Sequence, residues 1–179
     1  MKKDRHLYLT GYRGTGKSTI GRLLGRKLNR QCVDLDDRIE ELAQKTIKQI
    51  FDEGGEESFR SWESDALRLV AEGDPSVIAL GGGAILREDN RRLIAETGLC
   101  FWLDADAETL LQRIHSDLSS ATRRPALTDM SELEEIRGML KTREPLYRQA
   151  SDSHLDVSSG QPEEIAKEVL RRWLDFCGV

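Results

Sequence analysis

The chain has 179 residues, of which 27 are basic and 32 acidic, and it carries a formal net charge of −5. This length corresponds to one domain of ordinary size. The acidic balance argues against a broad electrostatic surface for nucleic acid, so we expect no nucleic-acid partner. No apolar run approaches the roughly 20 residues that span a bilayer, and the polar first residues do not fit a signal peptide. We therefore expect a single domain over residues 1–179, with no membrane partner and a cytoplasmic location.

Short apolar runs alternate with longer stretches of helical periodicity along most of the chain. The runs predict strands at residues 6–10, 32–35, 77–80, 99–103 and 154–157. Apolar residues recur at helical spacing between the first two runs and again near the C-terminus. This alternation is typical of βαβ units, so the expected fold class is α/β, with a five-stranded parallel sheet covered by helices on both faces.

Two segments do not fit simple crossovers between strands. Residues 37–72 contain several helical patterns interrupted at Gly54 and Gly55, and residues 116–130 are polar, with paired arginines and a proline. We interpret the first segment as a helical substrate-binding insertion and the second as a mobile lid. Ser131 and Glu134 form a capping-box pattern that predicts a helix to about residue 150, which Pro145 should bend or break.

Residues 11–18 read GYRGTGKS, which satisfies the pattern GxxxxGK[ST] of a phosphate-binding loop. The motif lies between a predicted strand and an amphipathic helix, as the pattern requires. Its glycines let backbone N–H groups turn toward phosphate oxygens, its lysine reaches the β- and γ-phosphates, and its serine hydroxyl can bind Mg²⁺. The alternative, a glycine-rich turn without a ligand, would not need the lysine and serine. The predicted ATP-binding residues of this segment are Gly14, Thr15, Gly16, Lys17, Ser18 and Thr19.

Other features narrow the class of P-loop protein. No NKxD-type segment for a guanine base follows a late strand, and the chain is short for a large ATPase, so a small-molecule kinase fits best. Asp34 and Asp36 end the second predicted strand, where residues two apart point to the same side. One acid could hold a Mg²⁺ water shell and the other an acceptor hydroxyl, with capping of the next helix as the alternative. Asp104 ends a more apolar strand and competes for the metal role.

Three glycines and several arginines are further candidates for ligand binding near the carboxyl ends of the predicted strands. Gly81, Gly82 and Gly83 follow the third predicted strand and allow the backbone to approach a ligand closely. Arg60 and Glu63 share one helical face, so the acid can orient the arginine, although a surface ion pair has the same spacing. Two further candidates are Arg124 in the lid and Arg143 near the end of the long helix.

The chain resembles the shikimate kinases in six segments that follow the family order: GYRGTGKSTIGRLLGRKL, DLDDRIE, IFDEGGEESFRSWE, ALGGGAI, RRPAL and REPLYR. Together these segments span nearly the whole chain. The resemblance implies a three-layer P-loop kinase fold and transfer of the ATP γ-phosphoryl group to the 3-hydroxyl of shikimate. The products would be shikimate 3-phosphate and ADP, in the chorismate pathway to aromatic amino acids. It also implies shikimate and ATP as partners, Mg²⁺ as cofactor, and a monomer.

The same resemblance implies roles for matching positions. Asp36 would hold the shikimate 3-hydroxyl, and Asp34 with Ser18 would anchor the Mg²⁺ shell. Asp104 would then have no role in metal binding. Glu63 would steady Arg60. The implied catalytic residues are Lys17, Asp36 and Arg124, the implied shikimate-binding residues are Asp36, Arg60, Gly81, Gly82, Gly83 and Arg143, and the implied further ATP-binding residues are Arg113 and Arg124.

The sequence departs from the family pattern in two regions. The lid reads RRPAL where RPLL is usual, and the stretch from Arg113 to Arg124 is a few residues longer than in compact members. Residues 158–161 lack an arginine that some relatives carry beside the adenine, which leaves this contact to Arg113 or to the backbone. Two rival functions remain. Another small-molecule kinase, such as a gluconate or nucleotide kinase, would differ in acceptor preference, and a non-catalytic ATP-binding switch would bind ATP without forming a phosphorylated product.

Overall fold

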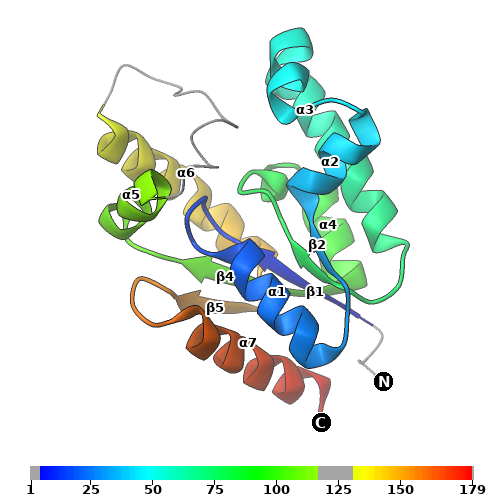
Figure 1. Cartoon of the computed structure of the whole chain (residues 1–179), viewed down its shortest axis with the longest axis vertical. Helices are drawn as coiled ribbons and strands as arrows, with labels where there is room; N and C mark the ends of the chain where they lie inside the picture. The colour runs from blue at the N-terminus through cyan, green and yellow to red at the C-terminus, as the bar shows by residue number, and fades with distance from the viewer. Residues whose placement is uncertain (1–4, 117–130, 179) are drawn as a thin grey trace.

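The computed structural model describes residues 5–116 and 131–178 and has an α/β architecture built on one parallel sheet (Figure 1). The strands lie in the order β2-β3-β1-β4-β5, and every paired neighbour is parallel. This confirms the predicted five-stranded parallel sheet. The strands are β1 His6–Thr10, β2 Cys32–Asp34, β3 Val77–Ala79, β4 Gly98–Asp104 and β5 Ser153–Asp156.

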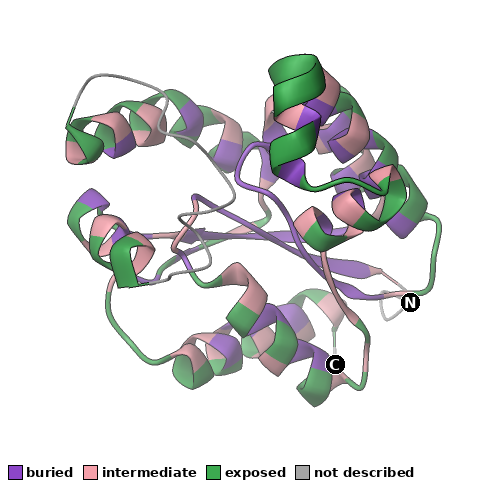
Figure 2. Cartoon of the chain, turned by 45° about the horizontal axis from the view of Figure 1, so that its top comes forward, coloured by how far each residue is buried: buried purple, intermediate pink, exposed green. Residues whose placement is uncertain are grey.

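The sheet is buried on both faces, as Figure 2 shows for the strands at the centre of the molecule. Alternate residues of β1 enter different cores: Leu7 and Leu9 face one side and Tyr8 the other. In β4, Phe101 and Trp102 divide in the same way. This alternation follows from the two-residue period of a strand, and burial on both faces explains why the runs are apolar throughout.

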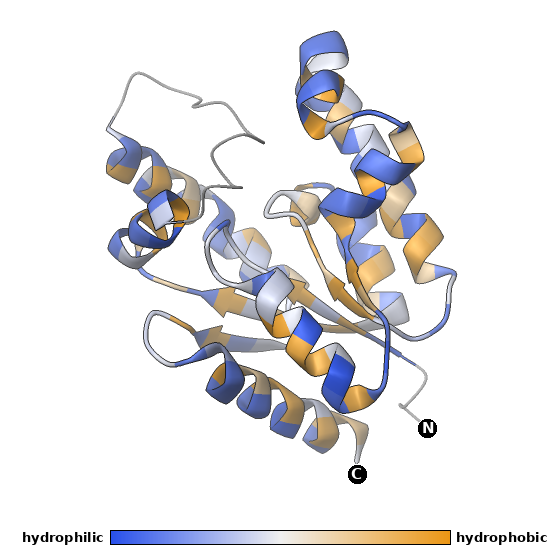
Figure 3. Cartoon of the chain, in the orientation of Figure 1, coloured by the Kyte–Doolittle hydropathy of each residue, from blue (hydrophilic) through white to orange (hydrophobic). Residues whose placement is uncertain are grey.

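Helices cover both faces and complete three layers. On the face that holds Leu7 and Leu9, α1 and α7 pack against the sheet, while α3 and α4 cover the opposite face. Hydrophobic and hydrophilic residues alternate along α1 and α7 (Figure 3), and the buried residues of both helices are part of the core beside the sheet. The helices are α1 Lys17–Leu28, α2 Leu35–Ala43, α3 Ile47–Ala71, α4 Glu88–Thr97, α5 Ala107–Ser116, α6 Glu132–Ala150 and α7 Pro162–Cys177, with a short 3-10 helix η1 at Ala84–Leu86.

Several local predictions can be compared with these bounds. The helical patterns predicted within residues 37–72 correspond to α2 and α3, and α3 is kinked at Gly55, whose φ of 66° is not helical. Ser131 caps α6 by accepting a hydrogen bond from the Glu134 N–H. Pro145 was expected to bend or break this helix; it does not break it, because α6 continues through Pro145 as one helix.

The predicted lid, with Arg124, lies outside the described residues apart from Ser116, which ends α5. No helix within residues 5–116 and 131–178 is both long enough and apolar enough to cross a membrane.

Candidate active site

Three loops meet at the carboxyl edge of the sheet because their strands are neighbours. The P-loop follows β1, the glycine triplet follows β3, and Asp34 ends β2. A Cβ placed on Gly82 would lie 3.3 Å from the Gly11 carbonyl oxygen, so the glycine triplet touches the P-loop. Open α/β sheets bind ligands beyond the carboxyl ends of their strands, which makes this edge the candidate site.

The P-loop is curled and closed by its own side chains. Gly14 and Gly16 have φ values of 84° and 86°, a conformation that favours glycine. The buried Thr15 hydroxyl donates to the Tyr12 carbonyl at 2.8 Å. Lys17 Nζ donates to the Gly11 and Tyr12 carbonyls, both at 2.8 Å. The loop leads directly into the N-terminus of α1, where the helix dipole favours a phosphate.

Asp34 joins the P-loop to the second strand. Its Oδ2 accepts a hydrogen bond from the Ser18 hydroxyl at 2.5 Å, and its Oδ1 accepts one from the Asp36 N–H at 3.1 Å. The predicted strand to residue 35 is therefore one residue too long: β2 ends at Asp34, which caps α2 from Leu35. Asp36 lies in the first turn of this helix, so strand alternation was the wrong reason to place the two acids together.

Asp104, the competing acid, lies apart from the Ser18 and Asp34 contact. It ends β4, and its Oδ2 accepts a hydrogen bond from His154 Nε2 at 3.4 Å. Burial raises the pKa of the Asp104 carboxyl, and the bond to His154 only partly opposes that effect. At the start of α1, the Ser18 hydroxyl thus lies against the Asp34 carboxylate, whereas the Asp104 carboxylate pairs with His154.

Arg60 is held in a buried ion pair, which excludes the surface alternative. Its side chain is 9% exposed and that of Glu63 is 0% exposed, with 2.7 Å between Arg60 Nη1 and Glu63 Oε2. Glu56 adds a second partner at 3.1 Å from Nη2. Burial lowers the pKa of the Arg60 guanidinium, but the charges and hydrogen bonds of Glu63 and Glu56 outweigh it and raise the pKa. The guanidinium is therefore charged and fixed in direction.

Both buried arginines contact the glycine triplet. A Cβ on Gly83 would lie 2.5 Å from Arg60 Cζ, so only glycine leaves room for the guanidinium there. Arg143, on α6, is 8% exposed and donates from Nη1 to the Gly82 carbonyl at 3.3 Å. Arginines from α3 and α6 thus converge on one loop beside the P-loop.

Some of the remaining residues predicted to bind ATP lie in the described part of the chain and one lies outside it. Arg113 donates from Nη2 to the Val157 carbonyl at 2.7 Å, so it lies against the loop that begins the 158–161 segment. Thr19 is exposed in the first turn of α1. Arg124 lies outside the described residues.

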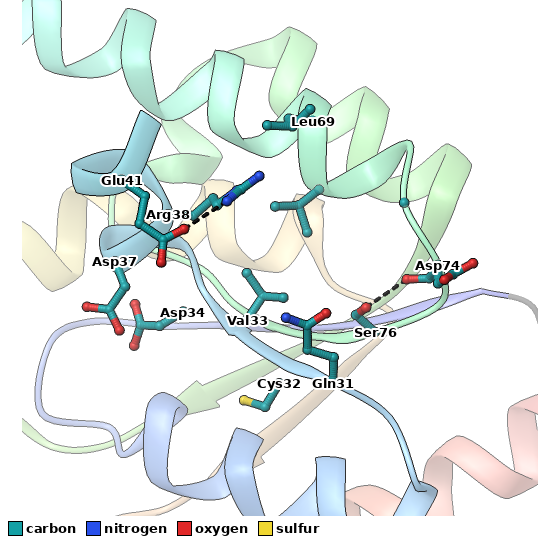
Figure 4. A pocket seen from close by; sticks show the side chains of 12 residues that line it. Gln31, Cys32, Val33, Asp34, Asp37, Arg38, Glu41, Leu69, Asp74 and Ser76 are labelled. Atoms are coloured by element: carbon teal, nitrogen blue, oxygen red, sulfur yellow. Dashed lines mark hydrogen bonds and ion pairs between the residues drawn. The ribbon is translucent and has the colours of Figure 1, made fainter. Parts of the chain in front are cut away.

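A cavity of about 330 Å³ lies along β2 between α2 and the C-terminal part of α3 (Figure 4). The carboxylates of Asp34 and Asp37 lie at one end; Val33 points toward α3, and Cys32 lies on the opposite side of β2, toward α1. It shares Asp34 with the candidate site, but its lining includes none of the P-loop, the glycine triplet or the two buried arginines.

A phosphate-binding loop at the carboxyl edge of a parallel sheet, with an acid from the next strand beside its serine, defines a P-loop kinase. The family model for shikimate kinase matches residues 13–173. The chain therefore belongs to the shikimate kinase family. It is an ATP-dependent kinase, a phosphotransferase of the shikimate pathway.

Individual relatives agree with this assignment. A shikimate kinase of Rhodopirellula baltica is 50% identical over 169 residues, covering 94% of this chain and 90% of its own. One from Nostoc punctiforme is 40% identical and covers 92% of this chain and 88% of its own. The solved shikimate kinase from Acinetobacter baumannii in complex with shikimate has a TM-score of 0.89 at 33% identity, covering 96% of this chain and 94% of its own.

Two contributors were missed by the sequence analysis. Glu56 is one helical turn before Arg60, a spacing that could have suggested a second partner for the arginine. Tyr147 donates its hydroxyl to the Gly82 carbonyl at 2.6 Å, a contact between residues far apart in sequence that no local pattern indicates.

Proposed function

We propose that this carboxyl edge transfers the ATP γ-phosphoryl group to the shikimate 3-hydroxyl, giving shikimate 3-phosphate and ADP. The observation that carries the proposal is the convergence of the buried Arg60 and Arg143 on one glycine loop beside the P-loop. Guanidinium groups match the planar carboxylate of shikimate with paired donors, which a lysine cannot do. The Acinetobacter baumannii shikimate kinase was solved in complex with shikimate, which supports the same acceptor here.

On the acceptor side, Asp36 orients the 3-hydroxyl and accepts its proton. As the hydroxyl oxygen bonds to the γ-phosphorus, the bond to the β-phosphate oxygen breaks and ADP leaves. Gly81, Gly82 and Gly83 offer backbone N–H groups to the other hydroxyls of shikimate. Glu63 keeps Arg60 charged and directed at the carboxylate.

On the phosphate side, Lys17 exchanges the Gly11 and Tyr12 carbonyls for the β- and γ-phosphates. The phosphates lie on the N–H groups of the P-loop and the N-terminus of α1. Arg124 adds positive charge to the transferred group, and Arg113 lies beside the adenine. The full set of ATP-binding residues is Gly14, Thr15, Gly16, Lys17, Ser18, Thr19, Arg113 and Arg124.

Ser18 and Asp34 fit the magnesium ion that accompanies ATP. Their oxygens lie 2.5 Å apart at the P-loop, and Mg²⁺ prefers oxygen ligands from one or two protein groups together with phosphates. When bound, the ion neutralises charge on the β- and γ-phosphate oxygens. Asp34→Asn should shift the Mg²⁺ dependence of turnover, whereas Asp104→Asn should not. The reverse result would return the metal role to Asp104.

The direct test measures ADP release with Mg²⁺ and ATP in the presence of shikimate, quinate, gluconate or a nucleoside monophosphate. We expect strong turnover with shikimate alone and phosphate on its 3-oxygen. Turnover with another acceptor would reject the roles of Asp36 and the two arginines. ATP binding without any phosphorylated product would support a non-catalytic switch.

We also propose that the enzyme acts as a monomer in the cytoplasm, since a single chain contains every residue assigned a role. Light scattering on the purified protein should give the mass of one 20.3 kDa chain. A dimer mass would contradict the monomer.

A further inference from the structure

Arg13 lies within the P-loop, at a position where the pattern GxxxxGK[ST] accepts any side chain. It is the only charged residue of segment 11–18 besides Lys17. Its backbone nitrogen lies 3.7 Å from the position of a Cβ on Gly82, so Arg13 lies where the P-loop meets the glycine triplet. In the proposed function the P-loop holds the ATP phosphates and the triplet holds the acceptor. Arg13 is therefore at the boundary between the two substrates.

The Arg13 guanidinium is not held by other side chains. Its buried Nε has no acceptor, and its side chain makes no hydrogen bond or ion pair within residues 5–116 and 131–178. The two arginines assigned to the acceptor differ in this respect, because Arg60 pairs with Glu63 and Arg143 donates to the Gly82 carbonyl. A buried donor without an acceptor is unfavourable. Turning the Arg13 guanidinium toward a ligand would therefore break no hydrogen bond.

Arg13 and Arg143 contact the same aromatic ring. Their Cζ atoms lie 5.8 Å and 6.0 Å from the centre of the Tyr12 ring, which is within the range of a cation–π contact. Tyr12 is 5% exposed, so its ring is fixed by packing. Neither guanidinium forms an ion pair with an acid in the described part of the chain. An anion that approaches this place is attracted by both charges.

The γ-phosphoryl group is the anion that reaches this place during the proposed reaction. It passes from ATP on the P-loop to the acceptor at the glycine triplet, and so crosses the boundary at Arg13. The shikimate carboxylate already has two guanidinium partners in Arg60 and Arg143. During transfer the negative charge spreads over three equatorial oxygens, and a planar guanidinium can donate to two oxygens of one phosphoryl group.

We propose that Arg13 is a catalytic residue that donates hydrogen bonds to the equatorial oxygens of the transferred phosphoryl group, and then to the phosphate of the product. The inference rests on the proposed function. The guanidinium stays protonated throughout, so it neither gives nor takes a proton. The contact is complete only while the phosphoryl group lies between the two loops. Arg13 therefore stabilises the transition state more than either bound substrate.

The kinetic test compares Arg13→Gln with Arg26→Gln. Arg13→Gln should lower kcat about 10- to 100-fold, the scale of one lost hydrogen bond to a charged group, with both KM values within about threefold. Arg26 is the matched control, because it is exposed in the last turn of α1, at the opposite end of this helix from the P-loop. Arg26→Gln removes the same charge and should keep kcat. A normal kcat in Arg13→Gln, or an equal fall in both variants, would overturn the inference.

Binding of the product provides a measurement that does not depend on turnover. In titration calorimetry with ADP present, Arg13→Gln should bind shikimate 3-phosphate about 10-fold more weakly than the wild type does, because the phosphate loses one charged donor. Its affinity for shikimate should stay within about twofold of the wild-type value, since shikimate has no phosphate. An equal loss of affinity for shikimate would assign Arg13 to the acceptor carboxylate and overturn the inference.

Arg13→Lys is the second variant. It keeps the charge but lacks the planar fork, so its kcat should lie between those of the wild type and Arg13→Gln. If Arg13→Gln does not fold, a kcat of Arg13→Lys at least about threefold below the wild type would support the inference, and an unchanged kcat would overturn it. Failure of the proposed function would look different, because the wild type itself would then neither phosphorylate shikimate nor bind shikimate 3-phosphate.

Discussion

Replacing Gly83 by alanine tests how the glycine triplet accommodates Arg60, the arginine that we propose binds the shikimate carboxylate. The added Cβ would lie 2.5 Å from Arg60 Cζ, whereas ordinary contacts begin at 3.4 Å. The guanidinium must therefore move by about 1 Å. Gly83 has a φ of −109° and a ψ of 0°, which alanine also adopts, so backbone strain contributes little. The obstructing atoms end a flexible side chain, so the protein should fold with Arg60 displaced.

A displacement of this size in a positioning group can reduce turnover by about 100-fold. We expect the shikimate KM of Gly83→Ala to rise about 10- to 100-fold, the ATP KM to stay within about twofold, and the melting temperature to fall by no more than about 4 °C. Steady-state kinetics with each substrate varied in turn, together with thermal unfolding, measure these values.

Gly138→Ala provides the matched control. Gly138 lies within α6, and a Cβ there would meet no atom within 4 Å. The variant should have normal kinetics and a slightly higher melting temperature, because alanine stabilises a helix by about 1 kcal/mol over glycine. A normal shikimate KM in Gly83→Ala, or an equal rise in both KM values, would refute the reasoning about Arg60.

Three further predictions follow from individual side chains. Lys17→Ala should lower kcat at least about 100-fold, the scale of one lost transition-state partner, and a near-normal rate would remove Lys17 from the mechanism. Arg143→Lys should raise the shikimate KM more than the ATP KM, since lysine lacks the fork, and equal effects would show that Arg143 does not bind the acceptor. The pKa of His6 is lowered by burial, and its Nδ1 accepts from the Ser76 N–H at 3.1 Å. Its contribution to the free energy of unfolding should be complete above about pH 6.5 and decline below it. Urea unfolding across pH 5–8 checks this, and an identical slope in His6→Asn would contradict it.

The strands could be predicted from sequence because a strand that is buried on both faces of the sheet is a short, continuous run of apolar residues. The run at residues 6–10 coincides with β1, and the other runs differ from the observed strands by one residue at one or both ends. The error at Leu35 has a clear cause: the Asp34 carboxylate caps the next helix and so ends the strand early. The pattern of apolar residues contains no signal for a side-chain cap of this kind.

The candidate site could be predicted only in part. Lys17 and Ser18 follow from a contiguous motif, and Arg60 with Glu63 from helical spacing, because these signals lie within a few residues. The burial of that ion pair, and the meeting of Arg143 and Gly82, depend on packing between α3, α6 and the sheet. Sequence periodicity carries no information on contacts of this kind.

The position of β1 in the sheet has a consequence for the synthesis of the protein. This strand is made first, yet its register places Leu7 between Val77 and Leu99. At about 5–20 residues per second, a ribosome needs on the order of 5–20 s to supply the second neighbour. Throughout that interval the nascent chain carries an apolar strand without its partners, next to the segment that will become the P-loop. The central strand of the enzyme is therefore exposed to aggregation for several seconds during translation.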